Sequence, residues 1–511
     1  TSKQSEVILT PYFRLRSEER GIHASDCILF VANIVNRAAD LRGSQSMRKN
    51  FSAIDQSKFA RLSGDANPIH VNEEVARRLL FGAPVVHGLH LVLWAWEEVA
   101  KSIDVFCCLS ELKAVFSQPT LVGDAVEVDV DFGEDSADVT VRGPSENAAA
   151  IQFSWVQAER VKSDILGSYE DVLCRDLSFE EASAAAGELP LALDRKLLAQ
   201  LAPNVERRFP EAQIALALAT TQIVGMECPG QHSVFNSLKL RFTQQSMQAT
   251  ALVYDVAKAM ERFSRLSLNM SSLGMEGEVA ASFRPNYQSQ APMSEIEALV
   301  SSEEFSSQRA LIVGGSRGLG EVAAKIITAG GGRVLLTYNL GKNDAEQLSR
   351  ELGPSSHTVA FNVTAIEMDD LNEEISEFKA THLYYFASPR ILLNRSSDSF
   401  NRDQFSEYIS FYVEGFARTV RNISKDIGSN LKVFYPSTVF LDEPVDGAWE
   451  YIAAKSAGEA TCQALMQDDD IKILIRRLPQ LTTDQTVGLL GVSGADPVLP
   501  IRDIVREMND F

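Results

Sequence analysis

The chain has 511 residues, 45% of them hydrophobic and 23% charged, and its formal net charge at pH 7 is -21. Its length suits roughly three domains of ~150 residues with an ordinary globular composition, and its negative charge argues against nucleic acids or anionic membranes as partners. The six cysteines form no CxxC pair and no apolar run is long enough to span a membrane, so we expect a reduced, cytoplasmic protein.

Residues 1–50 show no functional motif, and only a helix over 27–41 is expected there. Residues 51–160 have the pattern of an α+β domain. Helices are predicted over 53–62 and 85–100, and alternating patterns predict strands over 112–116, 124–130, 138–141 and 148–156. A long apolar helix followed by several antiparallel strands predicts a sheet wrapped around that helix.

A polar turn between the two predicted helices carries the strongest motif, Ser-Gly-Asp-Ala-Asn-Pro-Ile-His over residues 63–70. Asp65 and His70 lie on one bent loop, where a carboxylate and an imidazole could hold one water. Adding water to a 2-enoyl thioester needs a base, an acid and donors for the enolate oxygen. The backbone N–H groups that open the next helix, with Gly88 allowing close approach, could be those donors. The alternative is a capping turn in which Asp65 and Asn67 bond local backbone.

The full string resembles the MaoC-like, (R)-specific enoyl-CoA hydratase family, which has the hot-dog fold. Residues 113–116, with Pro119, Gly123 and Asp124 after them, are also similar to the family's strand after the helix. The resemblance implies that Asp65 and His70 hold and activate the water. We place Asn67, His87 and Gly88 in the substrate pocket. No metal site is expected, because His87 and His90 have no cysteine or carboxylate at ligand spacing.

Residues 189–287 repeat the same order of elements. A helix is predicted over 213–224 and strands over 237–242, 249–256, 263–270 and 278–283. The layout is similar to the second half of double hot-dog hydratases, although in the eukaryotic ones the active half comes second. The motif of residues 63–70 does not recur, so we expect a non-catalytic hot-dog domain that shapes the acyl pocket. The alternative is an unrelated α+β domain.

A segment rich in Ser, Glu and Pro, residues 288–307, is predicted to be a linker. In residues 308–511 strands alternate with helices, which predicts an α/β Rossmann fold with a doubly wound parallel sheet. The expected strands are 310–314, 333–338, 382–386, 431–435 and 471–475.

The first of these strands runs into a helix through a glycine-rich loop that contains Gly314, Gly318 and Gly320. Glycines at this spacing let the backbone approach a pyrophosphate and let the helix pack on the strand. The second strand ends at Asn339 without a carboxylate, and Arg317 lies in the glycine loop. This combination favours NADP(H) over NAD. Ser316 and Asn339 are further candidates for the 2′-phosphate.

Tyr451 and Lys455 are four residues apart on a predicted helix, so their side chains share one face. A nearby ammonium would lower the pKa of the tyrosine and let it pass a proton. Ser437 and Thr438 follow the strand over 431–435, and either hydroxyl could orient a carbonyl.

Together with the glycine loop, these residues resemble the short-chain dehydrogenase/reductase superfamily over 308–490. The resemblance implies Tyr451 as acid/base, Lys455 as its partner and ribose ligand, and Ser437 or Thr438 as third member, with Thr438 favoured by spacing. Further expected cofactor contacts are Leu319, Asn362, Val363, Ala387, Pro479 and Thr482. The chain departs from the family pattern at Val313, Asn362, residues 386–389 and Gln480. It also has Tyr412 where the family has a catalytic asparagine, and this change affects the proton relay that passes through that asparagine.

A (R)-3-hydroxyacyl thioester is the product of one chemistry and the substrate of the other. The sequence therefore predicts a bifunctional enzyme, an enoyl thioester hydratase/dehydratase joined to an NADPH-dependent 3-ketoacyl reductase. Acyl-CoA or an acyl carrier protein is the expected partner, and the sequence leaves a homo-oligomer open. One alternative is a hydratase with a pseudo-reductase that binds nucleotide. Another is a reductase of a non-thioester ketone in a glycan or secondary-metabolite pathway.

Overall fold

The computed structural model describes residues 47–144, 147–161, 165, 167–170, 172–365, 373–391, 400–427, 430–488, 491–492 and 494–511. The helix expected over 27–41 lies outside the described residues, as does all of the expected N-terminal segment before Met47. The chain divides into two compact units, one ending at Asn286 and the other formed by Tyr287–Phe511.

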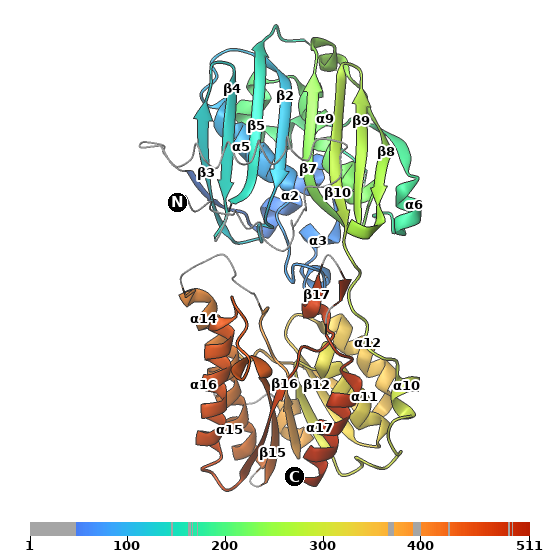
Figure 1. The fold of residues 1–511 in the computed structure, drawn as a ribbon, viewed down its shortest axis with the longest axis vertical. Coiled ribbons are helices and arrows are strands. Elements are labelled where there is room, and N and C mark those ends of the chain that lie inside the picture. Colours follow the sequence, from blue (N-terminus) through green and yellow to red (C-terminus); the bar gives the residue numbers. More distant parts are fainter. Residues whose placement is uncertain are drawn as a thin grey trace, which may run out of the picture. The chain divides into compact units, whose positions relative to one another are not determined.

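The first unit is built on one ten-stranded sheet with the order β1-β3-β4-β5-β2-β7-β10-β9-β8-β6 (Figure 1). The second five strands repeat the order of the first five in mirror image, and β2 and β7 join the halves as an antiparallel pair. This duplication is the double hot-dog predicted from the sequence. The strands are β1 (Met47–Asn50), β2 (Cys107–Phe116), β3 (Ala125–Phe132), β4 (Ser136–Arg142), β5 (Asn147–Gln157), β6 (Ala186–Pro190), β7 (Ser233–Phe242), β8 (Ala251–Met260), β9 (Arg265–Ser272) and β10 (Met275–Phe283).

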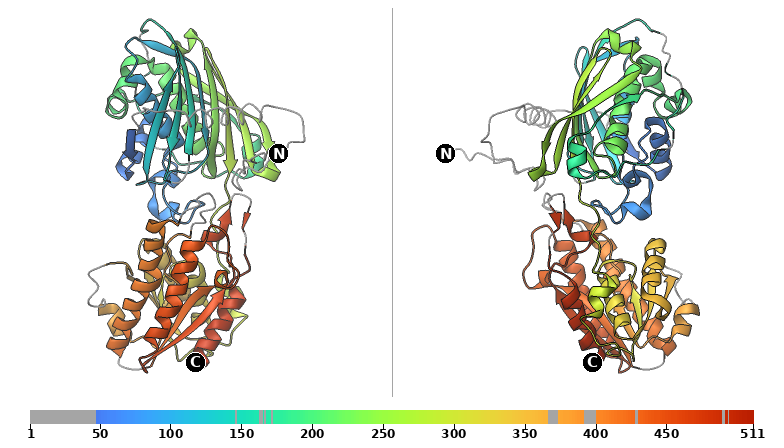
Figure 2. Two further views of the ribbon diagram at one scale, coloured as in Figure 1. Left: turned by 60° about the vertical axis from the view of Figure 1, so that its left-hand side comes forward. Right: turned by 90° about the vertical axis from the view of Figure 1, so that its right-hand side faces the viewer.

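Each half packs one apolar helix on the same face of the sheet, α5 (Gly88–Ala100) and α9 (Glu211–Gln222) (Figure 2). Every residue of α5 after Gly88 and every residue of α9 after Glu211 is buried, so both helices are enclosed on all sides, and most of their residues are apolar. The helix expected from residue 85 begins at Gly88, because Val85 pairs with Leu121 instead. The remaining helices are α2 (Ala53–Ser63), α3 (Pro68–Val71), α4 (Glu73–Ala76), α6 (Phe179–Ser183), α7 (Arg195–Leu201) and α8 (Pro203–Arg208).

The second unit is a six-stranded sheet with the order β13-β12-β11-β14-β15-β16, and all neighbours are parallel. This is the doubly wound order of a Rossmann fold, as predicted. Its strands are β11 (Arg309–Val313), β12 (Arg333–Tyr338), β13 (Ser356–Ala360), β14 (His382–Tyr385), β15 (Leu431–Thr438) and β16 (Ile471–Leu478), with a small hairpin of β17 (Val487–Gly488) and β18 (Gly491–Val492).

Helices cover both faces of this sheet (Figure 1). Alternate residues of β11 point to opposite faces, so Ala310 and Ile312 join one core and Leu311 and Val313 the other. The helices are α10 (Met293–Glu297), α11 (Gly318–Ala329), α12 (Lys342–Leu352), α13 (Glu373–Phe378), α14 (Arg402–Ile409), α15 (Phe416–Ile427), α16 (Trp449–Leu465) and α17 (Val498–Asp510).

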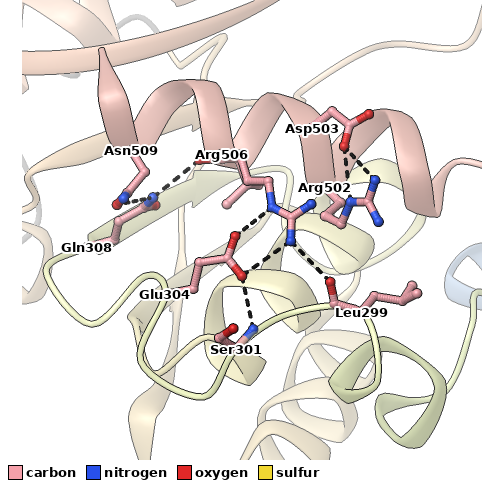
Figure 3. A network of polar contacts seen from close by, with 9 residues as sticks. Leu299, Ser301, Glu304, Gln308, Arg502, Asp503, Arg506 and Asn509 are labelled. Atoms are coloured by element: carbon pink, nitrogen blue, oxygen red, sulfur yellow. Dashed lines mark hydrogen bonds and ion pairs between the residues drawn. The ribbon is translucent and has the colours of Figure 1, made fainter.

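The segment expected to be a linker, residues 288–307, is instead part of the second unit. Ile296 and Phe305 are fully buried in one of its cores. Figure 3 shows how α17 also fastens this segment: Arg506 Nε lies 2.5 Å from a Glu304 carboxylate oxygen, and an Arg506 Nη2 hydrogen donates to the Leu299 carbonyl. The polar composition of the segment hid the two apolar anchors that fix it.

Candidate active sites

The motif of residues 63–70 forms a tight connection between α2 and α3. Gly64 ends α2 in the left-handed region with φ 74°, and a Cβ there would lie 2.6 Å from Gln222. Asn67 then caps α3, with Pro68 in the first turn, and its amide also donates to the Gly225 and Gly230 carbonyls. The capping function considered for this turn is therefore present, and it fixes the catalytic candidates on either side.

Asp65 is buried, and both halves of the double hot-dog contact its carboxylate. Thr221 of α9 donates to Oδ2 at 2.7 Å, and the Asn67 N–H donates to Oδ1 at 3.2 Å. Gly225 lies in a π-helical turn over Ile223–Glu227, and a Cβ on it would come within 2.2 Å of Oδ1. Burial raises the pKa of Asp65, while the charge of His70 and the Thr221 bond oppose that rise.

His70 is oriented by a hydrogen bond of 2.8 Å between its Nδ1 and the Val85 carbonyl. A carbonyl can only accept, so Nδ1 carries the proton and Nε2 is left as an acceptor. Burial lowers the pKa of His70, so the ring is neutral at neutral pH. His70 can therefore take a proton from a water at Nε2.

The imidazole rings of His87 and His70 are stacked, with their centroids 3.7 Å apart. Its Nε2 donates to the Asp65 carbonyl at 2.9 Å and its Nδ1 lies 2.9 Å from Gln56 Oε1, so protein partners use both nitrogens. Ligand atoms of Asp65, His70 and His87 lie within 4.8 Å of one another. The set does not fit a metal ion, because the His87 nitrogen that faces a carbonyl carries a proton and cannot act as a ligand.

Gly88 opens α5, directly after His87. A Cβ at this position would lie 2.9 Å from the Phe116 ring, so only glycine lets β2 pack so closely on the start of the helix. N–H groups in the first turn of a helix have no intrahelical acceptor. The His90 and Leu91 N–H groups donate to the His87 carbonyl, whereas those of Gly88 and Leu89 have no hydrogen-bond acceptor among the described residues and can meet an oxygen of a bound thioester.

In the second unit, α16 presents Tyr451 and Lys455, and β15 ends at Thr438. Thr438 opposes the burial that raises the pKa of Tyr451, which places its hydroxyl near that of the tyrosine, whereas Ser437 donates to Glu459 Oε1 at 2.5 Å. Of the two hydroxyls left open by the sequence, the structure therefore brings Thr438 to the tyrosine.

Lys455 donates to the Pro436 carbonyl at 2.7 Å, and its Nζ lies 3.9 Å from the centre of the Tyr412 ring and 5.8 Å from that of Tyr451. Burial lowers the pKa of Lys455 to about 7. Burial also raises the pKa of Tyr451. The expectation that the lysine lowers the tyrosine pKa is not met, because burial is the largest effect on the pKa of Tyr451 and also weakens the charge of the lysine.

Tyr412 occupies the place where an asparagine was expected, inside the π-helical turn η6 (Ser410–Gly415). Its hydroxyl shares a hydrogen bond of 2.6 Å with Ser388 Oγ. Tyr408, Tyr412 and Tyr451 are packed in one buried cluster. Two of the departures noted in the sequence, Ser388 and Tyr412, are thus partners of each other.

The glycine loop has the geometry that a dinucleotide requires. Gly314 has φ 79°, and a Cβ on it would lie 2.8 Å from the Ala387 nitrogen. A Cβ on Gly320 would lie 2.3 Å from the Gly314 carbonyl, so α11 can pack on β11 only through glycine. Gly318 has φ 58°, and a Cβ on it would meet nothing closer than Thr483 at 3.6 Å, which leaves the N-terminus of α11 approachable.

Arg317 forms an ion pair of 3.1 Å with Asp484, a buried carboxylate in the loop after β16. The sequence signalled Arg317 but not this partner. The other expected cofactor contacts lie around the same edge of the sheet: Ser316, Leu319, Ala387 and Thr482 are half-buried, Asn339, Asn362 and Pro479 are exposed, and Val363 is buried. Asn362 caps its own turn by accepting from Thr364.

Comparison with known proteins gives one matching family model and two partial relatives. The family model described as MaoC like domain matches residues 36–144. A 3-hydroxybutyryl-CoA dehydratase of Methylorubrum extorquens is 32% identical over 97 residues, 18% of this chain and 59% of that protein. The peroxisomal multifunctional enzyme type 2 of Drosophila melanogaster is 30% identical over 120 residues, 23% of this chain and 18% of that protein. The chain thus spans less than two thirds of either relative, and residues 36–144 contain a MaoC-like domain.

Solved structures resemble the second unit at low sequence identity. FolM alternative dihydrofolate reductase 1 from Brucella canis, complexed with NADP, is 12% identical and has a TM-score of 0.34, covering 41% of this chain and 90% of that one. Serine dehydrogenase from Escherichia coli is 14% identical with a TM-score of 0.33, covering 40% and 91%. The assignment of this unit to the short-chain dehydrogenase/reductase type rests on its strand order and on the Tyr451–Lys455 pair. Within the described part of the chain, no helix has both the length and the apolar character to cross a membrane.

Proposed function

We propose that this fusion of a MaoC-like double hot-dog unit to a unit of the short-chain dehydrogenase/reductase type is a bifunctional enzyme of acyl thioesters. The first unit would interconvert 2-enoyl and (R)-3-hydroxyacyl thioesters, and the second would reduce 3-ketoacyl thioesters to 3-hydroxyacyl thioesters. Coenzyme A or an acyl carrier protein would carry the acyl group.

The observation that carries the first activity is the buried Asp65 carboxylate beside a neutral His70 with a free Nε2. A water held between them would lose a proton to this pair as its oxygen attacks the β-carbon. The N–H groups that open α5 would stabilise the enolate oxygen, and the pair would then return a proton to the α-carbon. A carboxylate oxygen of Asp65 and a ring nitrogen of His70 lie within 4.8 Å of each other. One water with two hydrogen bonds of ~2.8 Å can span that separation.

The test of this activity is Asp65→Asn, assayed by hydration of crotonyl-CoA. The amide keeps the shape but cannot take a proton, so the rate should fall on the order of 10²–10⁴. The Asn variant should still reduce acetoacetyl-CoA, which serves as the check on folding. Near-normal hydration by the folded variant would reject the assignment.

The second activity rests on the group of Tyr451, Lys455 and Thr438. The raised pKa of Tyr451 keeps it protonated at neutral pH, so it can donate to the oxygen of a ketone that Thr438 orients. The glycine loop, Arg317 and the missing carboxylate after β12 fit NADP(H). When bound, this cofactor would supply the hydride.

The matched pair Thr438→Val and Ser437→Ala tests the reductase site. The valine removes the hydroxyl that contacts Tyr451, and we expect a loss of about 10²-fold or more in reduction of acetoacetyl-CoA. The alanine removes only a bond to Glu459, so less than about threefold is expected, which is under 1 kcal/mol. Equal losses would contradict the assignment of Thr438.

The departure at Tyr412 favours a second candidate for this unit, a nucleotide-binding pseudo-reductase. The tyrosine hydroxyl is tied to Ser388, where the family's asparagine would join the proton relay. Binding of NADPH without turnover of acetoacetyl-CoA by the wild-type protein would select this candidate over the reductase.

A further inference from the structure

Arg284 follows β10 in the first unit and is 98% buried, with 2% of its surface exposed. One Nη2 hydrogen donates to the Gln231 carbonyl, and the Arg284 backbone N–H donates to the His232 carbonyl at 2.7 Å. Among the described residues, Nε and Nη1 have no hydrogen-bond partner. No carboxylate forms a salt bridge with this guanidinium in the part of the chain that the structure describes.

An unpaired buried cation is unfavourable, because it gives up hydration without a compensating partner. Burial accordingly lowers the pKa of Arg284 to about 10. Such a buried guanidinium persists only when the rest of the fold offsets its cost. Its free donors can bind an anion, which would remove that cost. Nε and Nη1 lie on different edges of the guanidinium, and each offers an N–H donor to an anion such as a carboxylate.

Hydrogen bonds to two neighbouring carbonyls bring Arg284 close to the loop of residues 63–70, which contains Asp65 and His70. The side chain of Asn67, two residues from Asp65, donates to the Gly230 carbonyl at 3.2 Å, and Arg284 donates to the carbonyl of the next residue, Gln231. Electrostatics agree with this placement, since the Arg284 charge contributes to the lowered pKa of His70. Burial and the Asp65 charge raise the pKa of Cys174 to about 12, and the charge of Arg284 opposes them.

We propose that Arg284 is the specificity-determining residue of the hydratase site and binds a carboxylate at the distal end of the substrate's acyl chain. The preferred substrate would then be a 2-enoyl thioester with a second carboxyl group, and the inference rests on the hydratase activity proposed above. The phosphate of the pantetheine arm is the other anion on such a substrate. It lies a whole pantetheine arm away from the reacting carbons, whereas Arg284 lies beside the loop that acts on them.

The experiment compares crotonyl-CoA with glutaconyl-CoA, which carries a carboxylate on the terminal methyl of the crotonyl group. The wild-type chain should hydrate glutaconyl-CoA with a kcat/KM at least about tenfold higher. Arg284→Gln should lower that value by about 10- to 100-fold and change the value for crotonyl-CoA by less than about threefold. The matched control is Arg175→Gln, which removes an exposed arginine paired with Glu227 and should leave both values unchanged.

Hydration of crotonyl-CoA by Arg284→Gln is the internal check on folding. If that variant does not fold, Arg284→Lys keeps the charge and should retain part of the preference for glutaconyl-CoA. Equal losses on both substrates in a folded variant would overturn the proposal, as would a wild-type chain without the preference. A loss confined to CoA esters, with phosphate-free N-acetylcysteamine thioesters unaffected, would assign Arg284 to the phosphate and overturn it as well. In each of these cases hydration of crotonyl-CoA by the wild type, abolished by Asp65→Asn, still supports the hydratase.

Discussion

At the scale of single residues, Thr221 of α9 links the second half of the first unit to Asp65. Its hydroxyl donates to Asp65 Oδ2 at 2.7 Å and so favours the charged carboxylate. Thr220, the preceding residue, donates instead to the Ala217 carbonyl of its own helix. The second half of this unit therefore contributes a polar contact to Asp65.

Thr221→Val should weaken hydration and shift its pH dependence. Hydrogen bonds to charged groups contribute about 1.5–3 kcal/mol, so kcat/KM should fall roughly 10- to 100-fold at neutral pH. Loss of the donor raises the pKa of Asp65 further, so the acid limb of the pH–rate profile should move to higher pH. Thr220→Val, the control in the same helix, should move neither. If the acid limb of Thr221→Val stays where it is in the wild type, the titration of Asp65 is not what produces that limb.

Lys455 gives a stability prediction whose sign follows from burial. Its folded-state pKa is lowered from 10.5 to about 7, so the folded protein binds fewer protons than the unfolded chain between those values. Stability therefore rises with pH across that window, and the penalty of the buried lysine is complete below about pH 7. Lys455→Met should raise Tm relative to wild type more at pH 6 than at pH 9. A gain that is the same at both pH values would show that the lysine does not titrate in this window.

At the scale of elements, the sequence predicted those strands and loops whose geometry is determined by residues close together in the chain. The bounds of β12 match the expected strand, and the loops around Asp65 and Gly314 have the predicted geometry, since glycine, proline and capping residues act locally. Contacts between distant segments could not be read. Thr221 is 156 residues from Asp65 and Asp484 is 167 residues from Arg317, and no local pattern marks either one.

The loop after β16 gives a prediction about cofactor choice. Asp484 holds Arg317 at 3.1 Å and would compete with the 2′-phosphate of NADPH for it. Asp484→Asn removes the competing charge but can still accept from the Gln288 N–H, so NADPH should bind about tenfold more tightly and NADH as before. Arg317→Ala should weaken NADPH about tenfold or more, with NADH nearly unchanged.

Fluorescence titration with each cofactor measures these affinities. Lys379→Ala is the control, because this exposed lysine lies just before β14, at the opposite end of the strands, and an ion pair such as the one it forms with Asp426 at 3.6 Å contributes little. The net charge of -21 disfavours NADPH, the more negative dinucleotide, more than NADH, so it cannot produce a preference for NADPH. Equal affinity of the wild-type protein for NADPH and NADH would contradict the assignment of Arg317 to the 2′-phosphate.

At the scale of the whole molecule, the two compact units have separate cores and separate candidate sites. A substitution in one site should therefore leave the other reaction intact. Tyr451→Phe should abolish reduction and spare hydration, and Asp65→Asn should do the opposite. The two reactions would meet only in the (R)-3-hydroxyacyl thioester.

Mixing the two variants tests this division of labour. With NADPH and a 3-ketoacyl-CoA, the wild-type chain should form the 2-enoyl-CoA, Asp65→Asn should stop at the 3-hydroxyacyl-CoA, and Tyr451→Phe should form neither. An equimolar mixture should restore the 2-enoyl product after a lag, because the intermediate made by one chain must build up in solution before the other chain can dehydrate it. The lag should shorten as total protein rises, and chromatography of the three acyl-CoA species would follow it. A mixture that stays at the 3-hydroxyacyl-CoA, although each variant keeps its remaining half-reaction, would mean that the intermediate passes only within one chain and that the units are not independent.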